Sequence, residues 1–348
     1  MTSLSIQRPD DWHVHLRDGA ALASVVRFTA ERFGRAIVMP NLSPAVTSVD
    51  LAAAYRKRIV ASLAPGTRFD PLMTLYLTDA TSPQEIALAT ACGFIYGVKL
   101  YPAGATTHSN AGVTDISRAY PALARMEETG MRLLVHGETP HADVDVFDRE
   151  THFIDSVLAP LVARFPKLKV VLEHITTSHA VEFVAAARPG VAATITPQHL
   201  LHNRNAIFSG GIRPHYYCLP ILKRERDRQA LLAAATGGNP RFFLGTDSAP
   251  HERAAKESSC GCAGMFTAHA GIELYAEVFE QAGRLDRLQS FASHFGADFY
   301  GLPRHVDTIT LINEPWVPPK SYDFGNGTLV PYRGGEAIGW RLADKGIA

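Results

Sequence analysis

Short apolar runs alternate with longer amphipathic stretches along most of this chain. The runs are rich in β-branched and other apolar residues and cover residues 12–16, 35–39, 71–77, 95–100, 132–136, 169–174, 192–196 and 241–245. Stretches with helical periodicity lie between them, at 20–33, 50–61, 83–91, 116–128, 149–163, 179–187 and 226–235. Strands that alternate with helices in this way are typical of parallel βαβ units.

Eight such units predict an α/β fold of the closed (β/α)8 type, a TIM barrel. An open, doubly wound parallel sheet is the alternative, and it is disfavoured because no glycine-rich dinucleotide fingerprint follows the first run. The segment from Gly301 onward is rich in proline and strand-like. We therefore expect one domain over residues 1–348, in which a C-terminal extension from about residue 302 decorates the barrel.

Three connections are unusually long and rich in Pro, Gly and Thr, at 101–114, 197–220 and 248–267. All three follow the carboxyl end of a predicted strand. Long ordered loops inside a compact domain usually carry function. The loops therefore direct attention to one end of the barrel.

Composition excludes several classes of protein. Lys plus Arg and Asp plus Glu each number 34, so no basic field is available to hold a nucleic acid. No apolar run is long enough to span a membrane, and charged residues at Arg8, Asp10 and Asp11 argue against a secretory signal. The 4 cysteines are too few for a disulfide scaffold. We expect a cytoplasmic protein that acts on a small molecule.

Side chains with metal-binding or catalytic chemistry end the predicted strands. His13 and His15, at i and i+2 on one strand, project to the same face and can share a metal ion. The complete set at strand ends is His13, His15, Lys99, His136, His174 and Asp247. Each has an ordinary structural explanation alone, such as a hydrogen-bonded histidine, a snorkelling lysine or a capping aspartate. Together, at the rim where barrel enzymes place their catalytic groups, they favour a metal site.

These six residues, in this order, resemble the amidohydrolase superfamily with a binuclear zinc centre. The surrounding segments resemble the dihydroorotase family of the shorter, monofunctional bacterial type, and they extend from residue 8 to about 303. The segments that carry this resemblance are 11–18 (DWHVHLRD), 38–42 (VMPNL), 98–103 (VKLYPA), 135–138 (VHGE), 173–177 (EHITT), 196–200 (TPQHL), 218–223 (CLPILK), 245–251 (GTDSAPH) and 256–264 (KESSCGCAG).

The resemblance implies two Zn²⁺ per subunit. His13 and His15 would hold one ion with Asp247, and His136 and His174 would hold the second. An ammonium group cannot ligate a metal, so Lys99 would carry a carbamate derived from carbon dioxide (N6-carboxylysine) that bridges the two ions. Burial in the apolar run would favour the neutral amine that this modification requires. An unmodified lysine beside a single metal is the alternative.

The resemblance also implies the reaction, which is the reversible cyclisation of N-carbamoyl-L-aspartate to L-dihydroorotate and water in pyrimidine (UMP) biosynthesis. Asp247 would act as general base and then as general acid. The family further implies a homodimer.

Substrate contacts follow from the same resemblance. Arg17, Asn41 and His251 would bind the α-carboxylate, and the backbones at Leu219 and Ala263 would hold the ureide edge. The metal ligands His15 and His136 would also touch the substrate. A surface ion pair with Asp18 is the alternative explanation of Arg17.

Thr106 and Thr107 lie in the loop that follows Lys99, which resembles the family's mobile lid. A polar surface loop without substrate contact is the alternative. Cys260 and Cys262, with Cys218, are predicted to be free thiols behind the site, because the spacing of a four-ligand zinc site is missing.

Two other functions remain open at this point. A hydantoinase or allantoinase would use the same six metal residues on another cyclic ureide, but a clamp for a carboxylate would be wasted on an uncharged ring. A non-catalytic scaffold on the same barrel is the second alternative, and it is disfavoured because such proteins typically lose ligands, whereas none is missing here.

Overall fold

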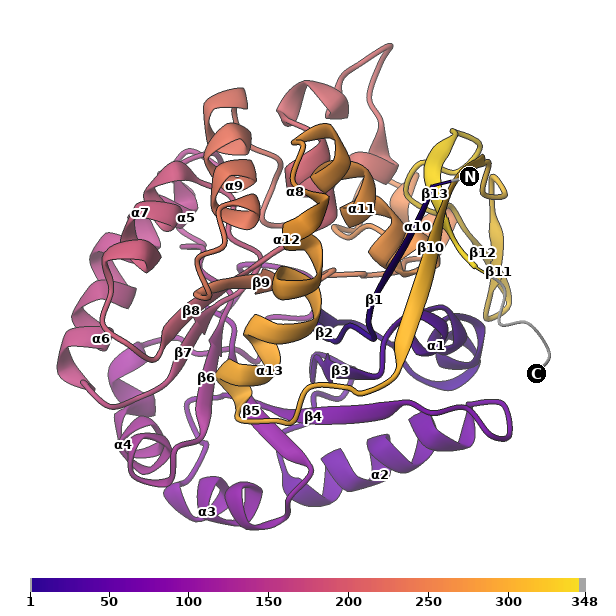
Figure 1. Ribbon diagram of the computed structural model, residues 1–348. Coiled ribbons are helices and arrows are strands. Elements are labelled where there is room, and N and C mark those ends of the chain that lie inside the picture. The colour runs from indigo at the N-terminus through magenta and orange to yellow at the C-terminus, as the bar shows by residue number, and fades with distance from the viewer. Residues whose placement is uncertain (1, 344–348) are drawn as a thin grey trace.

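The computed structural model describes residues 2–343. Its centre is an eight-stranded parallel sheet in the order β2 to β9, surrounded by helices (Figure 1). The strands are β2 (Asp11–Val14), β3 (Arg35–Val38), β4 (Asp70–Tyr76), β5 (Ile95–Leu100), β6 (Arg132–Val135), β7 (Val170–Leu172), β8 (Val191–Ile195) and β9 (Phe242–Leu244). Each predicted run contains one of these strands or overlaps it, which confirms the barrel prediction.

Closure of the barrel takes place where β9 returns to β2. Val14 and Ser248 form a parallel bridge, and the Asp247 backbone N–H donates to the His13 carbonyl at 2.9 Å. These bonds lie just past the strand ends, at the rim that carries the predicted site residues. The first and last barrel strands are thus joined directly beside the site.

The helices agree with the predicted stretches at most positions. They are α1 (Gly19–Arg32), α2 (Val49–Ala61), α3 (Pro83–Ala91), α4 (Tyr120–Thr129), α5 (Arg149–Phe153), α6 (Ala159–Arg164), α7 (Ser178–Ala186), α8 (Pro197–Leu201), α9 (Glu225–Thr236), α10 (Arg253–Lys256), α11 (Gly271–Gln281), α12 (Leu285–Gln289) and α13 (Phe295–Tyr300). Side-chain caps begin several of them, because Asp18, Ser48 and Ser82 each accept from a backbone N–H of the first turn.

The helix predicted over 149–163 is interrupted. A π-helical segment, Ile154–Leu158, separates α5 from α6. Pro160 lies in the first turn of α6. Since proline lacks an N–H and its ring crowds the carbonyl four residues earlier, the chain widens its turn at this point. Helices α8 and α10 to α13 were not predicted.

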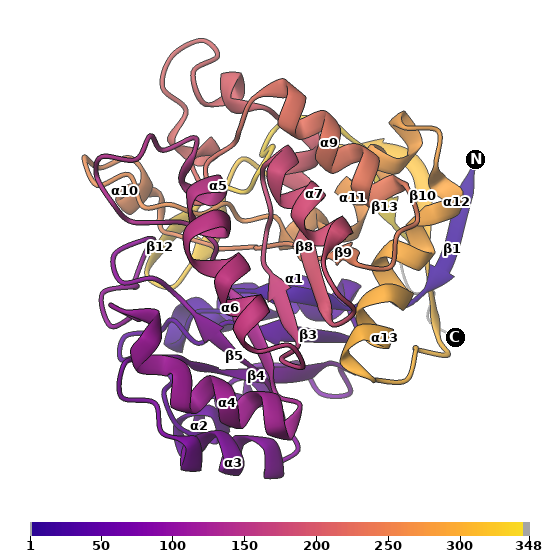
Figure 2. The same cartoon turned by 90° about the vertical axis from the view of Figure 1, so that its left-hand side faces the viewer.

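The C-terminal segment forms strands beside the barrel, as its pattern predicts. These are β10 (Thr308–Trp316), β11 (Tyr322–Phe324), β12 (Gly327–Leu329) and β13 (Ile338–Leu342). An N-terminal strand that was not predicted, β1 (Ser3–Gln7), pairs antiparallel with β10, and β13 completes this three-stranded sheet. Figure 2 shows β1 and β10 at the flank of the barrel. No helix within residues 2–343 is both long and apolar enough to cross a membrane.

Candidate active site

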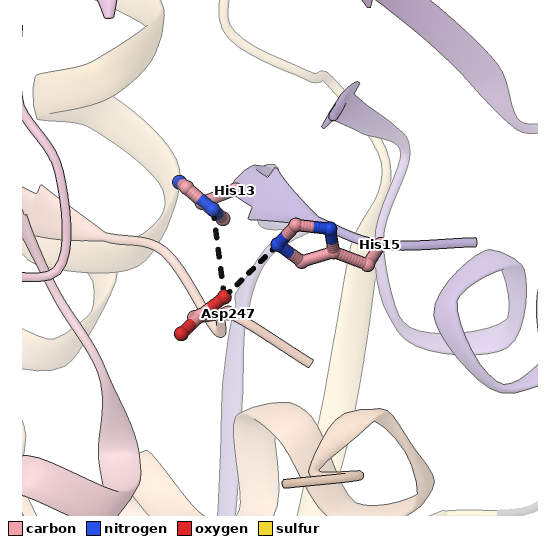
Figure 3. Close-up of side chains that lie close together, drawn as sticks. All are labelled: His13, His15 and Asp247. Carbon is pink, nitrogen blue, oxygen red and sulfur yellow. Dashed lines mark ion pairs between the residues drawn. The ribbon is translucent and has the colours of Figure 1, made fainter. Parts of the chain in front are cut away.

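Two histidines, one in the first barrel strand and one just beyond its end, point their Nε2 atoms at one carboxylate. His13 Nδ1 is hydrogen-bonded to Glu173 Oε2 at 2.9 Å, and His15 Nδ1 is hydrogen-bonded to Asn41 Oδ1 at 2.8 Å. Since both partners are acceptors, each ring carries its proton on Nδ1 and turns the lone pair of Nε2 the other way. Those two Nε2 atoms lie 3.5 and 3.2 Å from Asp247 Oδ1 (Figure 3).

This arrangement has the geometry of a metal-binding group. Among residues 2–343, only one group of three His, Cys, Asp or Glu side chains has its ligand atoms within 4.8 Å of one another, and it consists of His13, His15 and Asp247. All three are buried. The orientation of the ring lone pairs therefore suits a shared ion.

The other two predicted histidines continue the cluster. The ring centroids of His13 and His174 are 4.8 Å apart, and those of His174 and His136 are 4.9 Å apart. His136 Nε2 lies 3.1 Å from Glu138 Oε2, which leaves its Nδ1 free to act as a ligand. The four imidazoles thus form one continuous row across the barrel mouth.

Lys99, on β5, is fully buried at the base of the site. Its Nζ has no hydrogen-bond partner among the described residues, and neither do His13 Nε2 and His174 Nδ1. Its ammonium group lies 5.1 Å from the centroid of the Tyr101 ring. Buried polar atoms are almost always satisfied in folded proteins, so the two unsatisfied histidine nitrogens fit the binding of metal ions.

Burial controls the charge of these groups. It lowers the pKa of Lys99 to about 8 and raises the pKa values of Asp247 and Glu173 to about 7. It also lowers the pKa values of His13 and His174 well below the usual range, so both rings are neutral at neutral pH. Neutral imidazoles are the form that binds a metal ion.

Two of the predicted metal ligands, His174 and Asp247, occupy strained backbone positions. His174 has φ of 41° and Asp247 has φ of 44°, both in the left-handed region that residues with a Cβ rarely adopt. The strands β7 and β9 end at Leu172 and Leu244, two and three residues before these side chains, which belong to the turns beyond the strands. Strain of this kind is common where a side chain must be aimed at a site.

A cavity of about 350 Å³ lies above the histidine row. Every predicted site residue lines it except His13 and Lys99, which lie beneath. The lining residues are His15, Arg17, Asn41, Tyr101, Thr106, Thr107, His136, His174, Leu219, Asp247, Ala249, His251, Ala263 and Gly264.

Arg17 forms no ion pair within 4 Å among the described residues. Its guanidinium donates through Nε to the Pro250 carbonyl at 2.8 Å and approaches His251 Nε2 at 3.0 Å. The alternative partner, Asp18, instead receives two hydrogen bonds of 2.8 Å from Arg58. The surface ion pair considered for Arg17 is therefore absent, and its charge is directed into the cavity.

Of the two predicted lid threonines, which both line the cavity, Thr107 reaches the opposite wall. Thr107 Oγ1 donates to the Ala263 carbonyl at 3.5 Å, and the Thr107 carbonyl accepts from Asn41 Nδ2 at 3.4 Å. The same loop is folded on itself by Ser109, whose Oγ accepts from the Thr106 backbone N–H at 2.9 Å. The loop closes the cavity instead of lying free at the surface.

The cysteines are free, as predicted. Cys260 is exposed and Cys218 is buried, where burial raises the pKa of its thiol. Neither belongs to a group of three metal-binding side chains within the described part of the chain. The alternative of a thiolate metal site is therefore not supported.

Several residues of the site were not predicted from the sequence. Glu173 and Glu138 orient histidines, and Tyr101, Ala249 and Gly264 line the cavity. Each lies within two residues of a predicted site residue, so adjacency was the available signal. Periodicity alone could not tell which neighbour faces the site.

Comparisons with known proteins agree with this geometry. Residues 10–316 match the family model described as "Amidohydrolase family". The chain is 63% identical over 343 residues to a protein of Aromatoleum aromaticum named "Dihydroorotase", covering 98% of this chain and 100% of that one.

Two solved structures are similar over nearly the whole chain. A dihydroorotase of Campylobacter jejuni superposes with a TM-score of 0.90 at 35% identity and covers 98% of this chain and 97% of its own. A dihydroorotase of Saccharomyces cerevisiae in complex with 5-fluoroorotic acid has a TM-score of 0.89 at 33% identity, with 99% of each chain covered. A full-length match at this identity, together with a barrel-mouth group of histidines and aspartate, shows that the chain belongs to the amidohydrolase family and, within it, to the dihydroorotases.

Proposed function

We propose that the cavity at the barrel mouth is where this chain catalyses the reversible cyclisation of N-carbamoyl-L-aspartate to L-dihydroorotate and water. The observation that carries this proposal is the placement of Arg17, which has no ion-pair partner among residues 2–343, in the cavity that is also lined by His15 and Asp247 of the possible metal-binding group. The substrate combines a carboxylate with a carbonyl that must be activated. The cavity offers a cationic fork for the first and a metal-binding group for the second.

Two zinc ions fit the donor set. His13, His15 and Asp247 would hold one ion, and His136 and His174 would hold the other. Lys99, carrying a carbamate, would supply a shared anionic ligand, and its unpartnered Nζ in this apolar position supports that assignment. When bound, the ions supply Lewis acidity toward the substrate carbonyl and toward water.

The remaining side chains bind the substrate and move its proton. Arg17, Asn41 and His251 would hold the α-carboxylate, with His15 and His136 close to the reacting carbonyl. The backbones at Leu219 and Ala263 would hold the ureide edge. Asp247 would accept a proton during hydrolysis and deliver it to the ring nitrogen that leaves, and it would do the reverse during cyclisation.

The lid loop would exclude water once the substrate is bound. Thr106 and Thr107 line the cavity, and Thr107 contacts Ala263 across it, so the loop would open for entry. We further propose that residues 1–348 act as one domain and that the enzyme is a cytoplasmic homodimer. Pairing of β1 with β10, which ties both ends of the chain together, supports the single domain.

The test is the loss of ultraviolet absorbance of L-dihydroorotate on adding the purified protein. We expect turnover that disappears after chelation, returns with zinc and yields N-carbamoyl-L-aspartate. Asp247→Asn should lower kcat by about 10²- to 10⁴-fold, because a positioned general base contributes that much. Asp227→Asn is the matched control, since Asp227 is another buried aspartate, which accepts from Ser178 at the start of α7. Absence of turnover by the zinc-loaded protein would refute the proposal.

A further inference from the structure

A buried lysine outside the predicted metal-binding group binds three backbone carbonyls at once. Lys256, the last residue of α10, is only 4% exposed. Its Nζ donates to the carbonyls of Tyr217, Cys262 and Gly264 at 3.0, 2.8 and 2.6 Å. The three donors of an ammonium group match these three acceptors.

The charge of this lysine has no carboxylate partner. No ion pair within 4 Å joins Lys256 to an acidic side chain among the described residues, unlike the buried Arg32 and Arg35, which bind Glu273 and Asp10. Burial lowers the pKa of Lys256 to about 8, so the group remains charged at neutral pH. Keeping an ammonium group away from water costs free energy, and the three carbonyls offset that cost.

The carbonyls come from two segments that form one wall of the cavity. Tyr217 precedes Leu219 by two residues, and Cys262 and Gly264 flank Ala263. The Gly264 backbone N–H also donates to the Tyr217 carbonyl at 3.1 Å, which joins the segments directly. Lys256 therefore lies behind the wall and holds its two halves together.

Peptide geometry converts these bonds into an orientation at the cavity. In a trans peptide the C=O and N–H point in opposite directions. Because the Cys262 carbonyl points at Lys256, the Ala263 N–H of the same peptide points away from Lys256. Close packing leaves the loop little freedom, since a Cβ on Gly264 would lie 2.5 Å from the Ala249 carbonyl oxygen.

We propose that Lys256 is a positioning residue that sets the direction of the Ala263 peptide and its spacing from Leu219, and so governs recognition of the ureide edge of the substrate. This inference rests on the proposed function, which assigns the ureide edge to those two backbones. Lys256 itself does not line the cavity and contacts the substrate only through the peptides that it orients.

The test compares two non-reacting probes on zinc-loaded protein by calorimetry. Orotate carries both the ureide edge and the carboxylate, whereas succinate carries carboxylates alone. We expect Lys256→Met to weaken orotate binding about tenfold or more, with succinate affinity and zinc content within twofold of the parent. Ser258→Ala is the control, because this exposed side chain lies on the same loop and bonds only to Ala255.

Lys256→Arg provides a second variant in case the methionine variant does not fold. It keeps the charge, but a planar fork cannot converge on three carbonyls as an ammonium group does, so orotate binding should fall at least about threefold with succinate binding unchanged. Unchanged orotate binding in either folded variant would overturn the inference, as would parallel loss of both probes and of zinc. Failure of the parent protein to bind orotate would instead overturn the proposed function.

Discussion

Individual side chains at this site are oriented by a hydrogen-bond partner on the side that faces away from Asp247 or the cavity. Glu173 and Asn41 accept from the Nδ1 atoms of His13 and His15, so both Nε2 lone pairs face Asp247. Arg17 is aimed in the same manner by the Pro250 carbonyl. At the scale of the residue, function depends as much on these partners as on the side chains that reach the cavity.

Arg17 offers the sharpest prediction at this scale. Arg17→Gln should raise KM for L-dihydroorotate at least about thirtyfold, because it removes the charge that would bind a buried carboxylate. Steady-state kinetics with L-dihydroorotate and with uncharged dihydrouracil measure the effect. Any turnover of dihydrouracil should be unaffected, because this ring has no carboxylate for Arg17 to bind.

Arg58→Gln serves as the matched control for that experiment, because Arg58 pairs with Asp18 at the surface. Its KM should equal that of the parent. Equal losses on the charged and uncharged rings would contradict a carboxylate-binding role for Arg17.

At the scale of the element, the loops after the strands decide access and recognition. The loop after β5 covers the cavity and contacts Ala263 through Thr107. The loop after β9 contributes Ala263 and Gly264 to the opposite wall. The barrel strands and the turns at their ends hold the predicted metal ligands, and in the proposed function the loops are the parts that open and close.

Replacing both lid threonines tests this division. Thr106→Ala with Thr107→Ala should lower kcat/KM about tenfold or more, because two hydroxyl contacts of about 1 kcal/mol each would be lost while the metal-binding residues remain. Rates on L-dihydroorotate and zinc content should be measured together. Thr90→Ala, whose hydroxyl bonds only within α3, is the control. Unchanged kinetics in the double variant would remove the lid role.

At the scale of the whole molecule, the C-terminal extension is packed onto the barrel through an aromatic cluster. His269 is 1% exposed, and its ring centroid lies 5.6 to 6.5 Å from those of Phe266, Tyr322 and Trp316. Tyr322 and Trp316 belong to the extension. Burial lowers the pKa of His269 from 6.5 to about 3.

His269 should make the packing of the C-terminal extension on the barrel sensitive to acid. The unfolded chain binds a proton on His269 below pH 6.5 and the folded protein does not until about pH 3, so stability is lost as pH falls through that window. By pH 5 the loss amounts to about 2 kcal/mol. His269→Phe should therefore show a smaller drop in the free energy of unfolding between pH 7 and pH 5, measured by denaturant titration of metal-free protein. Parallel pH profiles would contradict this.

Much of the architecture follows from local patterns in the chain. Buried parallel strands need apolar residues on both faces, so the apolar runs around Val38, Val98 and Val171 can be recognised as strands from the sequence. The amphipathic stretches between the runs predict helices. The prediction of one continuous helix over 149–163 was wrong in detail, because Pro160 widens the helical turn between α5 and α6. Strand β1 was missed because its partner, β10, lies about 300 residues away, and no local window contains both.

The sequence by itself determined the barrel and which side chains lie at its mouth, because the carboxyl ends of parallel strands must meet at one rim. It also determined the family, through motifs that extend over most of the chain. Only the tertiary structure decided which nitrogen of His13 and of His15 faces Asp247. It also decided that Asp18 pairs with Arg58, so that Arg17 lines the cavity without this partner, and that Lys256 binds the wall segment behind Ala263. Most of these contacts join residues distant in the chain, such as His15 with Asp247 and Lys256 with Tyr217. Their directions depend on angles and burial that appear only after the elements have packed.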